Sequence, residues 1–188
     1  EFGHPASNSF PSELLERLTK EFYALSKNEA VAVIILKSEG NGTFCAGASF
    51  DELLQIEDEK TGLEFFSGFA KVINAMRVCP KFIIARIQGK CVGGGVGLAA
   101  STDYAIALNT SDVKLSELAV GIGPFVVGPA VERKIGLSAF SALAIDATNW
   151  RSAQWAYEKG LFAEIHDTLE KVDEAVLKIA KTLSTSNP

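Results

Sequence analysis

One carboxylate and two glycine-containing turns are the features of this sequence that could do chemistry. Glu117 is a lone carboxylate in an otherwise apolar stretch, and Gly121 and Gly123 follow shortly after it. Apolar surroundings disfavour the charged form of a carboxylate, which raises its pKa toward that of a useful base. One interpretation of Glu117 is therefore a general base. The other is an ordinary surface or helix-capping glutamate.

The two turns are residues 44–48 (FCAGA) and residues 93–97 (GGGVG), and each follows a stretch predicted to be a buried strand. Small side chains at such places let a ligand approach the backbone closely. Backbone N–H groups at the start of a helix point outward and carry partial positive charge. Two such groups converging on one point would make an oxyanion hole, where a thioester oxygen that gains charge could sit. Taken alone, a glycine after a strand usually marks only a tight turn or close helix packing.

A competing motif lies within the second turn. Residues 95–100 (GVGLAA) fit the dinucleotide pattern GxGxxG/A. That pattern belongs in the first strand–helix unit of a domain, with an acidic residue about 20 residues further on. Here it lies mid-chain, and Asp112, at a possible distance, sits among loop-forming residues. The position argues against a dinucleotide site.

The composition narrows the class of protein. The 188 residues, 47% of them hydrophobic, are enough for one packed domain. The formal net charge is −5, and no basic segment stands out as a footprint for nucleic acid or an anionic membrane. The longest uncharged stretch, residues 118–131, is too short and too interrupted by glycine and proline to span a bilayer, and residues 1–10 show no signal peptide.

The cysteines are expected to be reduced core thiols. Cys45, Cys79 and Cys91 are far apart and odd in number, and they have no metal-type spacing with His4 or His166. We therefore expect no metal site. Reduced thiols suit the cytoplasm, which is the predicted location, or an organelle matrix.

Alternating strands and helices predict an α/β fold with a partly parallel sheet. A continuous apolar run predicts a buried strand at residues 31–36, and largely apolar runs predict two more at 82–87 and 103–108. Helical spacing of apolar residues predicts helices between them and at the C-terminal end. The expected N-terminal signals are Ser9 for the first helix, a capping box at residues 61–64 for the second, and Asp167 with Glu170 for the last.

Taken together, these segments resemble the crotonase superfamily, specifically enoyl-CoA hydratase/isomerase proteins. The resemblance covers essentially the whole chain. Its motifs are residues 5–9 (PASNS), 44–48 (FCAGA), 88–95 (QGKCVGGG) and 117–121 (ELAVG). It implies a spiral of β-β-α turns, usually assembled as a homotrimer or hexamer. The expected domain is a single crotonase-type core at 1–188, with a helical C-terminal part at 137–188. The C-terminal trimerisation helices of the family are expected to be missing from this chain.

The resemblance also implies roles for individual residues. The amides of Ala48 and Gly94 would form the oxyanion hole, and Glu117 would move the proton. Ala46, Gly47 and Ala48 would contact the CoA moiety through the backbone. The substrate would be an acyl-CoA, with no cofactor besides the CoA thioester.

Three departures from the family pattern bear on the reaction. Many hydratases carry a first catalytic glutamate where this sequence has Gly97, so a single glutamate resembles the Δ3,Δ2-enoyl-CoA isomerases. Ser49 stands where an aspartate is usual, and Asp51 where a basic CoA contact is usual. Lys37 is a possible substitute for that basic contact.

The sequence therefore favours an enoyl-CoA isomerase that stabilises a thioester enolate. The alternatives are an enoyl-CoA hydratase, a non-catalytic acyl-CoA-binding relative, and a CoA-thioester hydrolase or decarboxylase. An acyl pocket is one interpretation of five apolar side chains, and ordinary core is the other: Phe50, Leu53, Phe65, Phe66 and Phe69.

Overall fold

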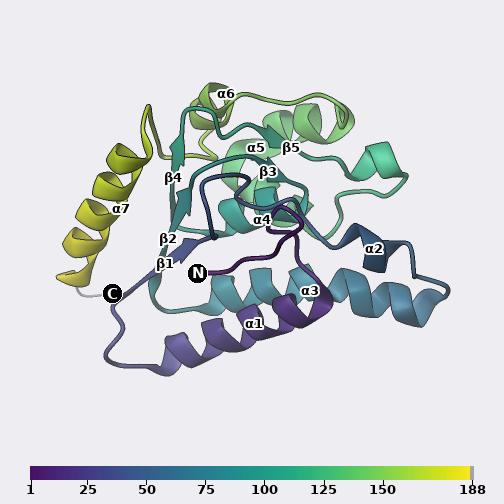
Figure 1. The fold of residues 1–188 in the computed structure, drawn as a ribbon, viewed down its shortest axis with the longest axis horizontal. Coiled ribbons are helices and arrows are strands. Elements are labelled where there is room, and N and C mark those ends of the chain that lie inside the picture. The colour runs from purple at the N-terminus through teal and green to yellow at the C-terminus, as the bar shows by residue number, and fades with distance from the viewer. Residues whose placement is uncertain (187–188) are drawn as a thin grey trace.

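Two parallel sheets organise the chain, whose computed structural model describes residues 1–186 (Figure 1). The last two residues of the predicted domain, 187–188, lie outside the described residues. The larger sheet has the strand order β1-β2-β4-β6, and all neighbouring strands are parallel. Its strands are β1 (Val33–Lys37), β2 (Phe82–Ile87), β4 (Tyr104–Leu108) and β6 (Glu164–His166).

The smaller sheet pairs β3 (Cys91–Val92) with β5 (Val113–Lys114). Single bridges extend it on both sides, from Cys45 to Cys91 and from Arg151 to Val113. The chain thus visits the larger sheet, then the smaller sheet, then a helix, and repeats. The predicted spiral of β-β-α turns is confirmed by this order.

The helices cover both faces of the larger sheet. The helices of the described residues are α1 (Ser12–Lys27), α2 (Phe50–Leu53), α3 (Glu59–Val78), α4 (Gly94–Ser101), α5 (Gly128–Ile145), α6 (Ala153–Glu158) and α7 (Leu169–Ser184), with a 3-10 helix η1 at Glu117–Val120. Helix α7 lies along one face, as Figure 1 shows, and α1, α3 and α4 lie on the other side. Successive strand side chains point to opposite faces. Accordingly, Ile84 and Ile106 pack against α7, whereas Ile83, Ala85 and Ile87 face the main core.

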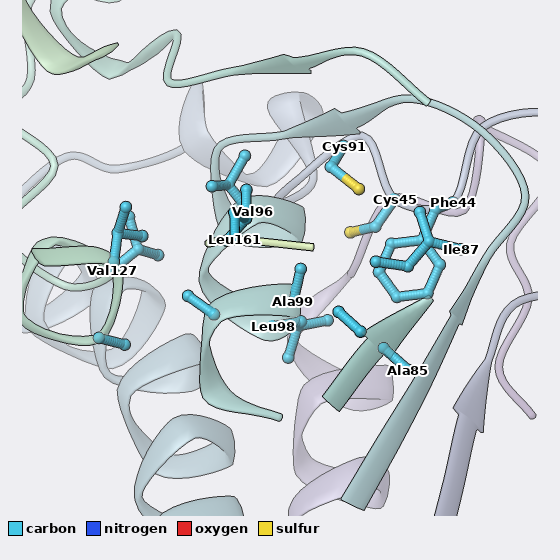
Figure 2. Packing of buried hydrophobic residues seen from close by; sticks show 14 of the residues in the cluster. Phe44, Cys45, Ala85, Ile87, Cys91, Val96, Leu98, Ala99, Val127 and Leu161 are labelled. Carbon is cyan, nitrogen blue, oxygen red and sulfur yellow. The ribbon is translucent and has the colours of Figure 1, made fainter. Parts of the chain in front are cut away.

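The main core runs directly beneath the two glycine-containing turns. Figure 2 shows Cys45 and Cys91 side by side in this core, which also contains Val96, Leu98 and Ala99 of α4. All these side chains are fully buried. The three cysteines are free. The ends of both turns are therefore held by close-packed neighbours.

Several predicted helix starts were wrong by a few residues. Helix α3 begins at Glu59, and its capping box joins Asp58 and Thr61, so Thr61 is the third helical residue and not the cap. The cap of α7 is Thr168 and not Asp167. The cap position of α1 is Pro11, while the Ser9 hydroxyl contacts His4.

The C-terminal part also differs from the expectation. Residues 137–188 were expected to be helical, but they include strand β6, which completes the larger sheet beside β4. Its three residues are too short to be recognised without the partner strand. Of the helices within residues 1–186, none is both long and apolar enough to cross a membrane.

Candidate active site

The two turns, η1 and the segment after it enclose one pocket of about 180 Å³. Glycine and alanine backbone forms one side of it, and apolar side chains from α2, α3 and residues 120–127 form the other. It is lined by Ala46, Gly47, Ala48, Ser49, Phe50, Leu53, Phe65, Phe66, Phe69, Gly93, Gly94, Ser116, Glu117, Val120, Ile122, Gly123, Pro124, Val126 and Val127. The three segments singled out in the sequence thus meet at one place.

The first turn, which lines this pocket, contains one backbone N–H that points away from the neighbouring N-terminal segment. Phe10 N–H donates to the Gly47 carbonyl at 2.8 Å, and Ser49 N–H donates to the Phe10 carbonyl at 2.9 Å. In an extended strand, successive peptide groups point to opposite sides. The N–H of Ala48 therefore points away from Phe10. Gly47 has φ +89°, a conformation that a side chain would strain.

The second turn supplies another N–H close by. Gly93 has φ +50° and precedes α4, so Gly94 is the first residue of the helix. The N–H of a first helical residue has no partner within its helix. Within residues 1–186, neither Ala48 N–H nor Gly94 N–H donates to another protein group. A Cβ placed on Gly47 would lie 3.5 Å from the Gly94 nitrogen, so the two turns are in contact.

Glu117, the first residue of η1, faces these turns. A Cβ placed on Gly93 would lie 3.2 Å from the Glu117 Oε1 atom. The Oε2 atom is buried and has no hydrogen-bond partner among the described residues. Burial raises the pKa of the Glu117 carboxyl above its ordinary value, against a smaller lowering by its own backbone N–H. Among the described residues that line the pocket, it is the one ionisable side chain.

Gly97 lies one helical turn beyond Gly94 and does not line the pocket. A Cβ placed there would lie 2.6 Å from Val127 Cγ1 and 3.4 Å from Ile73 Cδ1. Val127 thus fills the space that a side chain at position 97 would enter.

Two sequence interpretations fail on this geometry. Residues 95–100 are inside α4 and buried, and a Cβ on Gly95 would lie 2.5 Å from the Cys45 carbonyl oxygen, so they form no cradle for a dinucleotide. Lys37 does not line the pocket, and its ammonium lies 3.3 Å from the Glu1 carboxylate. Lys37 is therefore not placed to contact a ligand in this pocket. Ser49 caps α2 by accepting from Glu52 N–H.

The apolar wall is larger than the sequence suggested. All five residues offered as a possible acyl pocket line the cavity. The residues after Glu117 were missed, although the long uncharged stretch at 118–131 was a signal that this segment packs near the site. They are Val120, Ile122, Pro124, Val126 and Val127.

The sequence model of the Enoyl-CoA hydratase/isomerase family matches residues 1–188. The chain belongs to this family. Methylglutaconyl-CoA hydratase of Mus musculus mitochondria is 32% identical over 177 residues, which are 91% of this chain and 54% of that protein. An enoyl-CoA hydratase of Alternaria alternata is 31% identical over 173 residues, 90% of this chain and 56% of that protein. This family member therefore spans little more than half the length of these relatives.

Solved structures of the family share the fold. A Legionella pneumophila protein assigned to the enoyl-CoA hydratase/isomerase (crotonase) group superposes with a TM-score of 0.89 and is 31% identical, over 96% of this chain and 69% of that one. Enoyl-CoA hydratase of Bacillus anthracis gives a TM-score of 0.88 at 27% identity, over 96% of this chain and 69% of that one. The chain thus has the crotonase fold.

Proposed function

We propose that this family member shifts the double bond of a 3-enoyl-CoA to the 2-position. The thioester oxygen accepts hydrogen bonds from Ala48 N–H and Gly94 N–H. Glu117, as the carboxylate, removes a proton from C2, and the electron pair delocalises into a dienolate whose charge rests on that oxygen. The protonated Glu117 then returns the proton to C4, so that no atom is gained or lost.

The observation that carries this proposal is the single carboxylate of the pocket. Proton removal and return need one base that reaches two carbons of the same substrate. Hydration needs a positioned water, which two carboxylates orient better than one. In this protein, position 97 is a glycine, and Val127 occupies the space that a side chain there would enter.

The surroundings of Glu117 suit this role. An apolar pocket disfavours its charged form and raises its pKa. A stronger base removes a weakly acidic C2 proton more readily. Each amide donor aimed at a developing oxyanion contributes about 2.7–4 kcal/mol in other enzymes. Ala46, Gly47 and Ala48 offer backbone contacts to the CoA moiety at the same edge of the pocket.

Hydration is the second candidate, because relatives of similar identity are named hydratases. It would require a water held without a carboxylate at position 97. A thioester hydrolase or a decarboxylase would release CoA or CO2, and a non-catalytic acyl-CoA binder would form no product.

We also propose an acyl-CoA substrate without a further cofactor and assembly as a homotrimer or hexamer. Large exposed apolar side chains such as Phe125 (85% exposed) and Ile145 (76%) favour assembly, because a partner would cover them. A cytoplasmic location remains our proposal from the free cysteines.

A paired assay tests the reaction. The protein is incubated separately with a 3-enoyl-CoA and a 2-enoyl-CoA, and the products are separated and weighed by mass spectrometry. We expect the 3-enoyl substrate to give the 2-enoyl product at unchanged mass. Water addition would identify a hydratase. Release of free CoA or CO2 would identify the hydrolase or decarboxylase, and binding without turnover would identify the non-catalytic relative.

A further inference from the structure

We propose that Phe10 and Phe69 are positioning residues that align the two amide donors of the oxyanion hole. The inference rests on the proposed function, since it gives these two residues a part in the same site. Neither carries a group that could take part in the reaction. Their effect would act through Ala48 and Gly94.

The first contact joins Phe10 to the Ala48 donor. The two hydrogen bonds of the Phe10 backbone fix the peptide groups on both sides of Ala48, at 2.8 Å to the Gly47 carbonyl and 2.9 Å from Ser49 N–H. The orientation of the Ala48 N–H therefore follows the position of Phe10. The Phe10 side chain is fully buried and does not line the pocket.

The second contact joins the two rings. The centroids of Phe10 and Phe69 lie 5.6 Å apart with an interplanar angle of 69°, an edge-to-face arrangement. Phe69 is 6% exposed and comes from α3, far from Phe10 in the sequence. The pair thus links the N-terminal segment to the long helix below the pocket.

The third contact joins Phe69 to the Gly94 donor. A Cβ placed on Gly94 would overlap Phe69 Cζ, so the ring edge packs directly against the first residue of α4. A glycine is needed there because the ring takes the place of a side chain. Packing of the Phe69 ring against Gly94 therefore helps to fix the position of the Gly94 N–H.

The two turns are also joined by direct backbone contacts, but these do not replace the contacts through Phe10 and Phe69. The bridge between Cys45 and Cys91, with Val92 N–H donating to the Cys45 carbonyl at 2.9 Å, fixes the turns before they reach the donors. Ala48 lies three residues past that bridge. The contacts through Phe10 and Phe69 fix the far ends, where the two N–H groups must converge.

Phe10→Leu is the most informative variant, because Phe10 does not line the pocket and touches no substrate there. Displacing catalytic groups by about 1 Å can cost on the order of 100-fold in rate. We expect kcat for the enoyl-CoA reaction to fall at least about 10-fold, with KM changed less than about 3-fold, because enolate stabilisation suffers more than ground-state binding. Phe69→Leu should lower kcat similarly, and the double variant should lose little more than either single one, because both act through one path.

Phe22→Leu is the matched control. Phe22 is 2% exposed, lies on α1 and does not line the pocket. It should lose thermal stability as Phe10→Leu does but keep kcat. Equal kcat losses in the two variants at equal stability would overturn the proposal. Should Phe10→Leu not fold, Phe10→Met keeps most of the volume and removes the ring contact, with the same two expectations.

A readout that needs no turnover separates this proposal from the proposed function. In 15N-labelled protein, the Gly94 amide resonance should shift in Phe10→Leu, because the Phe10 ring contacts Phe69, which packs on Gly94. It should stay in place in Phe22→Leu. An unmoved Gly94 resonance in Phe10→Leu would overturn the positioning role. If the wild-type protein did not catalyse the proposed reaction, the proposed function would be overturned instead.

Discussion

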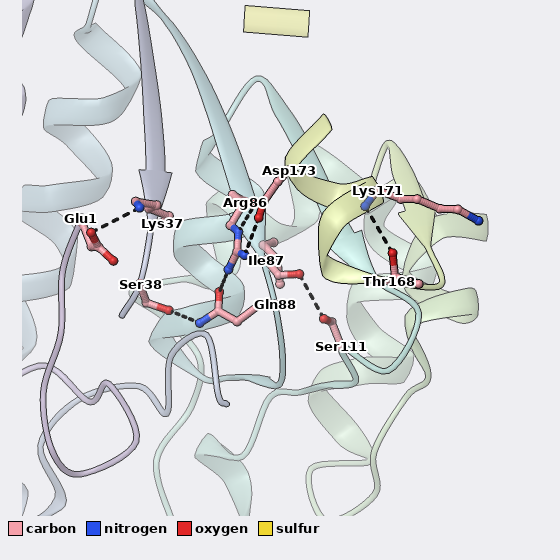
Figure 3. Close-up of polar contacts among 10 residues, drawn as sticks. All are labelled: Glu1, Lys37, Ser38, Arg86, Ile87, Gln88, Ser111, Thr168, Lys171 and Asp173. Atoms are coloured by element: carbon pink, nitrogen blue, oxygen red, sulfur yellow. Dashed lines mark hydrogen bonds and ion pairs between the residues drawn. The ribbon is translucent and has the colours of Figure 1, made fainter. Parts of the chain in front are cut away.

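Two polar regions of this molecule differ in how completely their polar groups are hydrogen-bonded. Between the larger sheet and α7, the Arg86 guanidinium donates to both Asp173 carboxylate oxygens at 2.7 and 3.1 Å (Figure 3). It also donates to Gln88, whose amide donates to Ser38 at 2.6 Å. In the pocket, two N–H groups and one buried carboxylate oxygen have no protein partner among residues 1–186.

The difference separates polar groups that are paired within the fold from pocket groups that have no partner among the described residues. A buried polar group without a partner costs about 1–3 kcal/mol, so a fold keeps few of them. The two carboxylates illustrate this. Asp173, bonded to Arg86, has a lowered pKa, whereas Glu117, desolvated and unpaired, has a raised one. Asp173 thus takes part in an ion pair that stabilises the fold, whereas Glu117 has no ion-pair partner among the described residues.

The largest expected effect is on catalysis. Glu117→Gln keeps the shape of the side chain and removes the base, so kcat should fall about 1,000-fold, within the usual range for a general base. The variant should still bind the substrate. Unchanged turnover in a steady-state assay would mean that Glu117 does not carry the proton.

The second-largest effect is expected from substitutions at Gly97, beside which Val127 fills the space. Gly97→Glu would drive a side chain into Val127 and bury a charge, so we expect a loss of about 3 kcal/mol or more in the free energy of unfolding, measured by urea denaturation. Gly97→Ala with Val127→Ala should be more stable than Gly97→Ala alone, because the shortened residue 127 leaves room for the new methyl. If Gly97→Glu were as stable as wild type, the space would not be filled as described.

A smaller effect is expected at the paired region. Asp173→Asn removes the charged acceptor of Arg86 and should cost about 1 kcal/mol, a value reduced because the Asp173 side chain is 50% exposed. The folded pKa of Asp173 is lowered, so its stabilising contribution is present above its unfolded pKa and is lost as the pH falls. The melting temperatures of variant and wild type should converge on acidification. The kcat of the variant should be unchanged.

The smallest effect has the opposite pH dependence. The folded pKa of Glu117 is raised, so the folded state favours the protonated carboxyl. The stability of the wild-type protein that depends on this protonated form is lost as the pH rises through the folded pKa. Glu117→Gln should therefore gain in melting temperature over wild type as the pH rises from acid to neutral. A constant difference across that range would contradict the raised pKa.

Much of the fold and of the candidate site could be predicted from the sequence, but not all of it. The largely apolar run at residues 82–87 predicted strand β2 with its correct bounds, because a mostly buried strand has a strong local signal. The two glycine-containing turns and Glu117 were singled out in the sequence, and all three line the same pocket. Val127 was missed because its relation to Gly97 depends on how α5 docks on α4, which no local pattern records. The cap of α3 was misplaced because Asp58 and Thr61 each fit a capping pattern, and only the structure shows their reciprocal bonds.

The central claim is that one carboxylate carries a proton between two carbons of the same substrate. Turnover of a 3-enoyl-CoA in D2O, with the product examined by mass spectrometry, tests it most directly. If Glu117 returns the proton that it removed, the product is the 2-enoyl-CoA, without added water and with less than one deuterium per molecule. A 3-hydroxyacyl-CoA product, or a substrate left unchanged by folded protein, would contradict the account.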